Sequence, residues 1–506
     1  MKLPPHIAFA FSIAFVCAAR AEVKLPAIFS DHMVLQADMP APVWGWAEPG
    51  EEVTVSITGQ TQTAKADANG KWSVKLGKLK ASAEPQTLTA KGKNARAVQD
   101  VLVGEVWLGS GQSNMALQVA RAKNAPEEIA TAQFPAMRMF TVRSGPAASA
   151  QEDFQGSWQV CDPKNAPLFS AALYFFGREL HKTLGVPVGM INSSVGGTPI
   201  ESWISPEAQA RSPELQKYLE TQRKTDAAFN ADAAKAKYER DLAKWKEAAE
   251  KAKVAGTKPP VAPRDPIALR EKKGNIGGLF NGKIAPLIPY AMRGAIWYQG
   301  EANSAPTKAP FYHHQLTALI ADWRTRWGDE FPFAWVQLPN FDGGEVRDWP
   351  TVREEMLKTL NVPKTGMAIT IDIGEQKNIH PQNKQEVGRR LALWALGTVY
   401  GRKVAAISGP LPAGHEIRGS EVVLKFQHAD GGLVAKGGEL KGFVIAGEDR
   451  QWKPAQAKID DGKVIVSNPD VKQPAAVRYA WANWPECNLY NGAGLPASPF
   501  RTDDWK

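Results

Sequence analysis

The first hundred residues alternate between apolar and polar side chains with the period of two that is typical of β-strands. The alternation is clearest at 53–57 and 72–76, and turn-forming residues stand at 48–50 and 67–70. We therefore expect a small β-sandwich-like module over residues 22–100. Trp44 and Trp46 lie on one face of a predicted strand, and we expect them in the core of this module rather than on a sugar-binding surface.

Short, continuous apolar runs replace this alternation after residue 100, and segments with helical periodicity separate them. The predicted strands are 101–103, 106–108, 188–192, 294–298, 333–338 and 367–371, and the predicted helices are 171–183, 311–327 and 385–396. Apolar strands that alternate with helices indicate a parallel sheet that is covered on both faces. We predict an α/β domain over residues 101–405.

A helical insertion, 205–272, interrupts this domain. Its central part, 213–254, is rich in Ala, Lys and Glu, and Tyr238, Leu242, Trp245 and Ala249 form an apolar stripe. We expect a helical hairpin that lies over the domain and is dispensable for its chemistry. Strand-like alternation returns after residue 405, at 422–426, 442–445 and 463–466, which predicts a second β-sandwich-like module over 406–506.

The first 21 residues fit a secretory signal peptide, with Lys2, an apolar run at 7–19 and a small-x-small site before Glu22. We therefore expect an exported protein, periplasmic or extracellular. No later apolar run approaches the about 20 residues that a membrane span requires, so we expect no transmembrane segment. Cys161 and Cys487 remain after the predicted cleavage, and the sequence leaves open whether they pair.

Composition narrows the classes of function. The chain has 506 residues, of which 43% are hydrophobic and 22% charged, with a formal net charge of +9. The basic residues are interleaved with acidic ones instead of forming a stripe with aromatic residues, so we expect no nucleic-acid partner. Neither a CxxC nor an HExxH pattern occurs, and we expect neither a metal nor a cofactor.

The most informative segment is 107–115, WLGSGQSNM, in which a buried strand leads through a glycine turn to Ser113 and a predicted helix. A serine at that place lies at the carboxyl edge of a parallel sheet, where ligands of open α/β folds bind. A helix-capping serine would give the same local pattern. The segments 192–203, 297–303 and 378–381 also follow predicted strands, so the four segments are expected to meet in one pocket.

The segments contain the blocks GQSNM, GGTPIESW, WYQGEAN and IHP, the last followed by NK-EVGRRLAL. In these blocks the sequence resembles the SGNH/GDSL hydrolases, and specifically the sialate O-acetylesterase family of carbohydrate esterases. The resemblance extends to the segment 478–490 and so covers nearly all of the chain after the signal segment. It implies an SGNH-like parallel sheet flanked by helices, with β-modules on either side. It also implies that Ser113 is the nucleophile and His380 the general base.

The same resemblance implies further site residues. The oxyanion would be bound by the backbone N–H groups of Ser113 and of Gly196 or Gly197, and by a side chain of Gln299 or Asn303. Gln112 and Asn114 flank the nucleophile and are expected to take part in binding. Many SGNH enzymes carry an aspartate three residues before the histidine, but Lys377 stands there in this chain.

The group that orients His380 is therefore open at this point. Candidates are Asp372, Glu301, Glu375, the side chain of Asn378 and a backbone carbonyl. Glu301 has a structural alternative, as a buried ion-pair partner of Arg293 or Arg353. We consequently expect a Ser–His dyad with an unassigned third member.

The function implied by the resemblance is the removal of O-acetyl groups from sialic acid, with an acetylated sugar or glycan as the partner. An esterase acting on acetylated xylan or another glycan is a close alternative, because the blocks say little about the sugar. A non-catalytic carbohydrate-binding protein is a second alternative, which the presence of both Ser113 and His380 disfavours. The sequence leaves the oligomeric state open.

Overall fold

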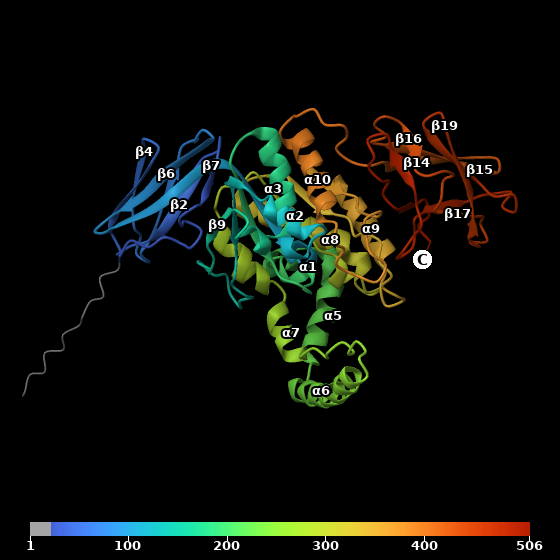
Figure 1. Cartoon of the computed structure of the whole chain (residues 1–506), viewed down its shortest axis with the longest axis horizontal. Helices are drawn as coiled ribbons and strands as arrows, with labels where there is room; N and C mark the ends of the chain where they lie inside the picture. The colour runs from blue at the N-terminus through green and yellow to red at the C-terminus, as the bar shows by residue number, and fades with distance from the viewer. Residues whose placement is uncertain (1–21, 506) are drawn as a thin grey trace, which may run out of the picture.

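The computed structural model describes residues 22–505, so the predicted signal segment lies outside the described residues. Figure 1 shows a β-rich body at the blue end of the chain, a central α/β body, and a second β-rich body at the red end. No helix among residues 22–505 is long and apolar enough to cross a membrane.

The central body is built on a sheet in the order β13-β12-β11-β7-β10-β8-β9. Its strands are β7 (Ala95–Gly111), β8 (Phe134–Thr141), β9 (Trp158–Cys161), β10 (Val188–Ser194), β11 (Gly294–Tyr298), β12 (Phe333–Val336) and β13 (Thr365–Ala368). All neighbours pair in parallel except β8 and β9. This confirms the predicted parallel α/β arrangement. β7 lies where the strand order reverses, with β10 on one side and β11 on the other, which is the usual ligand position in open α/β sheets.

Helices cover both faces of this sheet. They are α1 (Ser113–Ala116), α2 (Ala125–Ala130), α3 (Ala171–Leu184), α8 (Tyr312–Trp327), α9 (Trp349–Lys358) and α10 (Lys384–Trp394). Trp107 of β7 packs edge-on against Phe176 of α3 and Trp394 of α10. Trp297 of β11 points to the opposite face and packs against Trp323 of α8. Two buried tryptophans thus anchor the helical layers on either side of the strands that lead to the site.

The long strand β7 continues out of the central sheet into the N-terminal β-module, so the boundary we predict near residue 100 lies inside one strand. The other strands of that module are β1 (Val34–Gln36), β2 (Ala41–Trp46), β3 (Glu52–Ile57), β4 (Gln60–Lys65), β5 (Lys71–Leu76) and β6 (Ser82–Lys91). β6 and β1 pair with β7 up to residues 103 and 104, and β10 pairs with it from residue 105 onward. At this junction Glu105 accepts hydrogen bonds from Arg293 at 2.7 Å and from Gln36 at 3.2 Å.

Our prediction that Trp44 and Trp46 lie in the module core is met only in part, because both are half-buried and Trp44 alone of the two packs against the hydrophobic core. The buried residues of β2 are Ala41, Val43 and Gly45, and the two tryptophans occupy the alternate, half-buried face. Trp44 packs edge-on against Phe29 with ring centroids 4.7 Å apart. Gly45 holds the core position because an added Cβ would lie 2.1 Å from the Lys24 carbonyl oxygen, and the two tryptophans therefore occupy the other face of the strand.

The C-terminal module is built from two four-stranded antiparallel sheets and one two-stranded sheet. Its strands are β14 (Leu411–Arg418), β15 (Glu421–Gln427), β16 (Leu433–Ala435), β17 (Phe443–Ala446), β18 (Lys453–Pro454), β19 (Gln456–Asp460), β20 (Lys463–Ser467), β21 (Ala476–Tyr479), β22 (Leu489–Asn491) and β23 (Phe500–Arg501). Arg501 is paired with Glu354 of α9 at 2.8 Å, which joins the module to the central α/β domain. Cys161 and Cys487 are both free thiols.

The helical insertion has two parts that differ in burial. It contains α4 (Pro206–Ala210), α5 (Gln216–Ala227), α6 (Ala231–Val254) and α7 (Pro266–Lys273). Leu215, Tyr218 and Leu219 are buried against the domain at the start of α5. In contrast, α6 has no buried residue and lies at the far end of the insertion, beyond α5 and α7 (Figure 1). Our expectation of a hairpin lying over the domain is therefore wrong for α6. Trp245 instead donates a hydrogen bond to the Pro260 carbonyl within the insertion, at 2.7 Å.

Candidate active site

Ser113 is placed by the sharp end of β7. Gly111 has a φ of +133°, and a Cβ there would lie 2.2 Å from the Tyr298 carbonyl oxygen, so only glycine fits beside β11. The backbone N–H of Gln112 then donates to that same carbonyl at 3.0 Å. Ser113 is the first residue of α1, so its own N–H belongs to the group that has no partner inside a helix.

His380 comes from the loop between β13 and α10. Its Nε2 lies 2.8 Å from Ser113 Oγ, which is hydrogen-bond distance for residues 267 positions apart. Its backbone N–H donates to Asn378 Oδ1 at 3.0 Å, and the Asn378 amide donates to Glu375 at 2.9 Å. Asn378 and Glu375 therefore shape the loop that carries the imidazole.

The surroundings of His380 favour the neutral imidazole. Burial lowers the pKa of His380 below its usual 6.5, and the positive charges of Lys384, Arg121 and Arg264 lower this pKa further. A neutral imidazole is the form that accepts a proton from a serine hydroxyl. The site is thus ready for general-base chemistry at neutral pH.

No carboxylate of residues 22–505 forms a hydrogen bond with His380 Nδ1. Asp372, one predicted orienter, instead forms a two-pronged ion pair with Arg390 at 2.6 and 2.9 Å and accepts a hydrogen bond from Tyr490. Lys377 is exposed. The geometry therefore presents a Ser–His pair without a carboxylate on the imidazole.

A buried network next to the dyad connects the two loops that carry it; we call it the clamp, and it consists of Asn114, Lys384 and Glu301. The Asn114 amide donates to Glu301 Oε1 and to the carbonyl of Ile379 at 3.0 Å. Lys384 Nζ donates to Asn114 Oδ1 at 2.8 Å and to the carbonyl of Pro381 at 2.6 Å. The clamp thus binds the residue after the nucleophile to the residues on both sides of His380.

The clamp holds two ionisable groups away from water. Burial raises the pKa of Glu301, whose Oε2 has no hydrogen-bond partner among the described residues. Burial lowers the pKa of Lys384 to about 7. Arg293 binds Glu105, and Arg353 donates to backbone carbonyls such as that of Leu338 at 2.9 Å, so neither is the ion-pair partner considered for Glu301.

The loop that follows β10 lies directly over the nucleophile. A Cβ added to Gly196 would lie 3.2 Å from Ser113 Cβ, and Gly197 has a φ of +78°. No hydrogen bond to the backbone N–H of Ser113, Gly196 or Gly197 is formed within the described part of the chain. Since an oxyanion requires free donors beside the nucleophile, these three N–H groups are the candidates that the backbone supplies.

The predicted side-chain oxyanion donors point elsewhere. The Gln299 amide donates to Gln112 Oε1, Asn303 Oδ1 and the Thr198 carbonyl, at 3.1, 2.7 and 3.2 Å. The Asn303 amide donates to Glu201 at 2.9 Å and to Gln315 at 3.3 Å. Both amides are fully buried and committed to this network, which argues against either one as a direct oxyanion donor.

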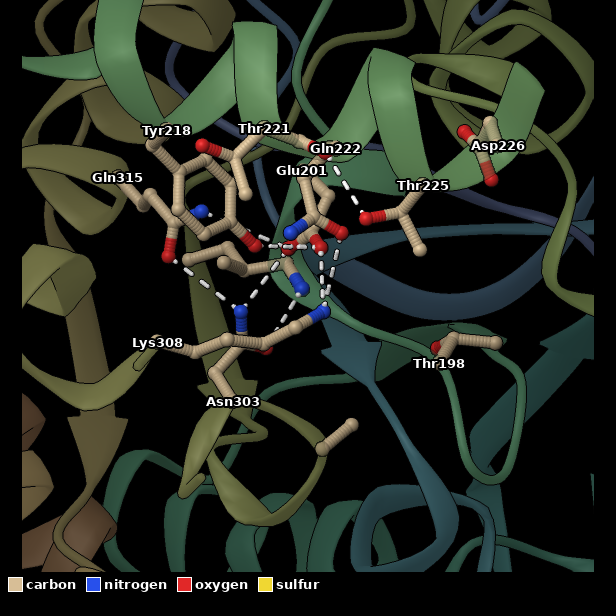
Figure 2. Close-up of polar contacts among 12 residues, drawn as sticks. Thr198, Glu201, Tyr218, Thr221, Gln222, Thr225, Asp226, Asn303, Lys308 and Gln315 are labelled. Carbon is tan, nitrogen blue, oxygen red and sulfur yellow. Dashed lines mark hydrogen bonds and ion pairs between the residues drawn. The ribbon is translucent and has the colours of Figure 1, made fainter. Parts of the chain in front are cut away.

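Sequence reasoning missed Lys384, Glu201 and Tyr218. Lys384 stands in the NK-EVGRRLAL block and Glu201 in the GGTPIESW block. Their position in these blocks was the feature of the sequence that could have marked them as site residues. Figure 2 shows Tyr218, Asn303 and Lys308 converging on Glu201. Tyr218 donates to Glu201 Oε1 at 2.6 Å, which brings the insertion into contact with the catalytic loops.

Among residues 22–505, no group of three or more His, Cys, Asp or Glu side chains is arranged to hold a metal ion. The residues that carry the site are thus a serine, an imidazole, backbone N–H groups and a buried Asn–Lys–Glu clamp. This set matches nucleophilic catalysis of acyl transfer.

Comparison with known proteins agrees with this geometry. The family model described as carbohydrate esterase, sialic acid-specific acetylesterase, matches residues 103–256 and 283–396. Rat sialate O-acetylesterase is 30% identical over 94% of this chain and 94% of its own, and human sialate O-acetylesterase is 29% identical over 94% and 92%. A crystal structure of a carbohydrate acetylesterase from Xanthomonas citri superimposes with a TM-score of 0.81 at 36% identity, over 96% of this chain and 100% of that chain. On the family match, the sequence identity and the structural superposition, the chain belongs to the sialic acid-specific acetylesterase family of carbohydrate esterases.

Proposed function

We propose that this protein is a serine esterase that removes O-acetyl groups from carbohydrates, and from sialic acid in particular, through an acyl-enzyme on Ser113. The observation that carries the proposal is the 2.8 Å contact between Ser113 Oγ and His380 Nε2 at the carboxyl edge of the parallel sheet. The names of the relatives, sialate O-acetylesterase in rat and human, support sialic acid as the sugar.

In the first half of the reaction, His380 Nε2 takes the hydroxyl proton of Ser113 while Oγ attacks the acetyl carbonyl carbon. The carbonyl oxygen becomes an oxyanion, which the N–H groups of Ser113 and Gly196 or Gly197 would bind. One such donor is worth about 3 kcal/mol of the activation barrier. The tetrahedral intermediate then collapses, the bond from carbon to sugar oxygen breaks, and His380 gives its proton to the departing sugar oxygen, which leaves as a hydroxyl group.

In the second half, water attacks the acetyl-serine. His380 takes one proton from this water and returns it to Ser113 Oγ as acetate leaves. Each half uses the same neutral imidazole, which the burial of His380 and the nearby cations favour. The clamp holds the imidazole and the serine hydroxyl within hydrogen-bond distance, so the dyad can work without a carboxylate on Nδ1.

The decisive experiment compares the parent and Ser113→Ala on 9-O-acetylated sialic acid and on acetylated xylan. We expect the parent to release acetate faster from the sialic acid. Ser113→Ala should lose activity by several orders of magnitude while unfolding at the parent temperature. Faster turnover of acetylated xylan would reassign the sugar, and retention of more than a few per cent of activity in Ser113→Ala would refute the nucleophile.

We also propose that the protein is exported. The proposal is supported by the basic start, apolar run and small-x-small site of residues 1–21. Mass spectrometry of the protein recovered from its native host should find a chain that begins at Glu22. An intact Met1 on the mature protein would contradict export by this route.

A further inference from the structure

A polar cavity lies where the insertion meets the catalytic domain. Its volume is about 350 Å³, within the size range of ligand pockets. Helices α5 and α7 form one side, and the loop after β10 together with Lys308 forms the other. The lining side chains used below are Glu201, Gln222, Asp226, Arg270, Asn275 and Lys308.

One wall of this cavity is held rigidly by Glu201. Its carboxylate is buried and accepts hydrogen bonds from Tyr218 of α5 at 2.6 Å and from Asn303 at 2.9 Å (Figure 2). Lys308 Nζ lies 3.3 Å from Glu201 Oε1 and also 3.3 Å from Gln222 Oε1 of α5. Glu201 therefore fixes α5 to the same asparagine that anchors the loop behind the nucleophile.

The opposite wall presents paired charges and amides. Arg270 of α7 forms an ion pair with Asp226 of α5 at 2.9 Å and stacks over Phe229 at 4.7 Å. The charged residues that line the cavity thus form two opposite pairs, Lys308 with Glu201 and Arg270 with Asp226. Such a lining offers many hydrogen-bond donors and acceptors without a net charge, which suits the hydroxyl groups of a neutral sugar.

The cavity borders the loop that lies over the nucleophile. Pro199 lines it and stands three residues after Gly196, the residue that lies over Ser113. A chain advances at most about 3.6 Å per residue, so the cavity wall begins within about 11 Å of Gly196. This span is short enough for the next unit of a glycan to reach from one position to the other.

We propose that this cavity is a subsite for a neutral sugar unit attached to the acetylated sugar, and that the insertion exists in part to build it. The inference rests on the proposed function and adds what that function leaves open: the enzyme recognises an oligosaccharide rather than a free monosaccharide. Gln222 and Asn275 are the lining groups that contact the sugar, while Tyr218 and Glu201 hold the wall.

The test uses two variants that change the cavity in opposite ways, Gln222→Ala, which removes a polar group, and Gln222→Trp, which fills the space. For each, kcat/KM is measured on acetylated sialyllactose and on p-nitrophenyl acetate. We expect the ratio of the two constants to fall about tenfold, as KM for the oligosaccharide rises. Lys217→Ala, an exposed position on the same helix, is the matched control and should leave the ratio at the parent value.

A ratio that stays at the parent value in both Gln222 variants would overturn the subsite. Calorimetric titration with unmodified sialyllactose separates this result from failure of the proposed function, because binding requires no hydrolysis. If the parent binds the oligosaccharide and Gln222→Trp does not, the subsite stands even in a protein that does not cleave acetyl esters. Equal binding by both proteins would refute it.

Discussion

Replacing Lys384 with methionine tests whether the clamp does the work that a triad carboxylate does elsewhere. Methionine has a similar length but no N–H group, so the variant loses the hydrogen bonds to Asn114 Oδ1 at 2.8 Å and to the Pro381 carbonyl at 2.6 Å. Lys384 is charged at a pH below its lowered pKa of about 7, and there a hydrogen bond from a charged group is worth about 1.5–3 kcal/mol. At such a pH, Lys384→Met should reduce the free energy of unfolding by about 3–6 kcal/mol. Urea titration followed by tryptophan fluorescence would measure the loss.

The same substitution should reduce kcat. In this variant the loops carrying Ser113 and His380 are no longer joined through Lys384, and of the clamp's bonds only that from Asn114 to the Ile379 carbonyl still links them directly. A misplacement of about 1 Å costs about 100-fold in rate. We therefore expect kcat on a small acetyl ester to fall about 100-fold with little change in KM. The exposed Lys377→Met, which removes a lysine three residues before the histidine, is the control and should retain the parent kcat.

The pH profile distinguishes a positioning role from simple destabilisation. The charge of Lys384 lowers the pKa of His380, so removing it should raise this pKa and move the acid limb of kcat/KM to higher pH. The pKa of His380 that this limb reports should remain below 6.5, because burial and the charges of Arg121 and Arg264 persist. A Lys384→Met enzyme with kcat within about twofold of the parent and an unmoved acid limb would refute the reasoning.

Three further outcomes follow from the structure. Asp372→Asn should leave kcat near the parent value, because Asp372 binds Arg390 instead of the imidazole, but should lower the unfolding free energy by about 3 kcal/mol; a loss near 10⁴-fold in kcat would contradict this. Deleting α6, replaced by a short Gly/Ser linker, should preserve small-ester turnover and cooperative unfolding, since the helix buries no residue. Tyr218→Phe should destabilise the protein by about 2 kcal/mol in urea titration, because Glu201 loses a buried hydrogen bond; an unchanged midpoint would show that the bond contributes nothing.

The layered fold and the approach of Ser113 to His380 could be predicted because both depend on strand order. Apolar strands separated by helices specify parallel neighbours, and parallel strands end at one edge. The glycines of the first two blocks marked the places where backbone must come close, as Gly111 does beside β11. Ser113 and His380 stand 267 positions apart, but each follows a predicted strand, so the order of the elements together with the family resemblance was sufficient.

The roles of the polar residues in the blocks could not be predicted in the same way. From the sequence, an amide in a loop at the site is interpreted as a hydrogen-bond donor to the ligand. The structure shows that the partners of the Gln299 amide include Gln112, 187 positions away. Lys384 stands near the start of a predicted helix, where a lysine is usually exposed. In the structure Lys384 is buried and donates a hydrogen bond to Asn114, 270 positions away. Tertiary contacts decide whether a single polar group is buried, and these contacts cannot be inferred from the residue type.

The insertion shows the same limit in a second form. The apolar stripe that the sequence shows, Tyr238, Leu242, Trp245 and Ala249, lies on the alanine-rich helix α6, whereas α5 contains a single alanine. Only α5 is docked, because Leu215, Tyr218 and Leu219 meet a complementary surface beside Phe311. An apolar stripe predicts that a helix packs against something, but not which element it packs against.

The continuity of β7 between the N-terminal module and the central sheet affects local unfolding and the effect of truncating the chain. Ser113 stands two residues beyond the end of a strand whose first half is clasped by β6 in the N-terminal module. Fraying of that module would release one end of the strand that positions the nucleophile, so the two bodies share one cooperative unit of local unfolding. A truncation at residue 100 would remove the first part of β7, residues 95–100, together with the module. The N-terminal module is in this sense a mechanical support that holds the catalytic serine in place from a distance.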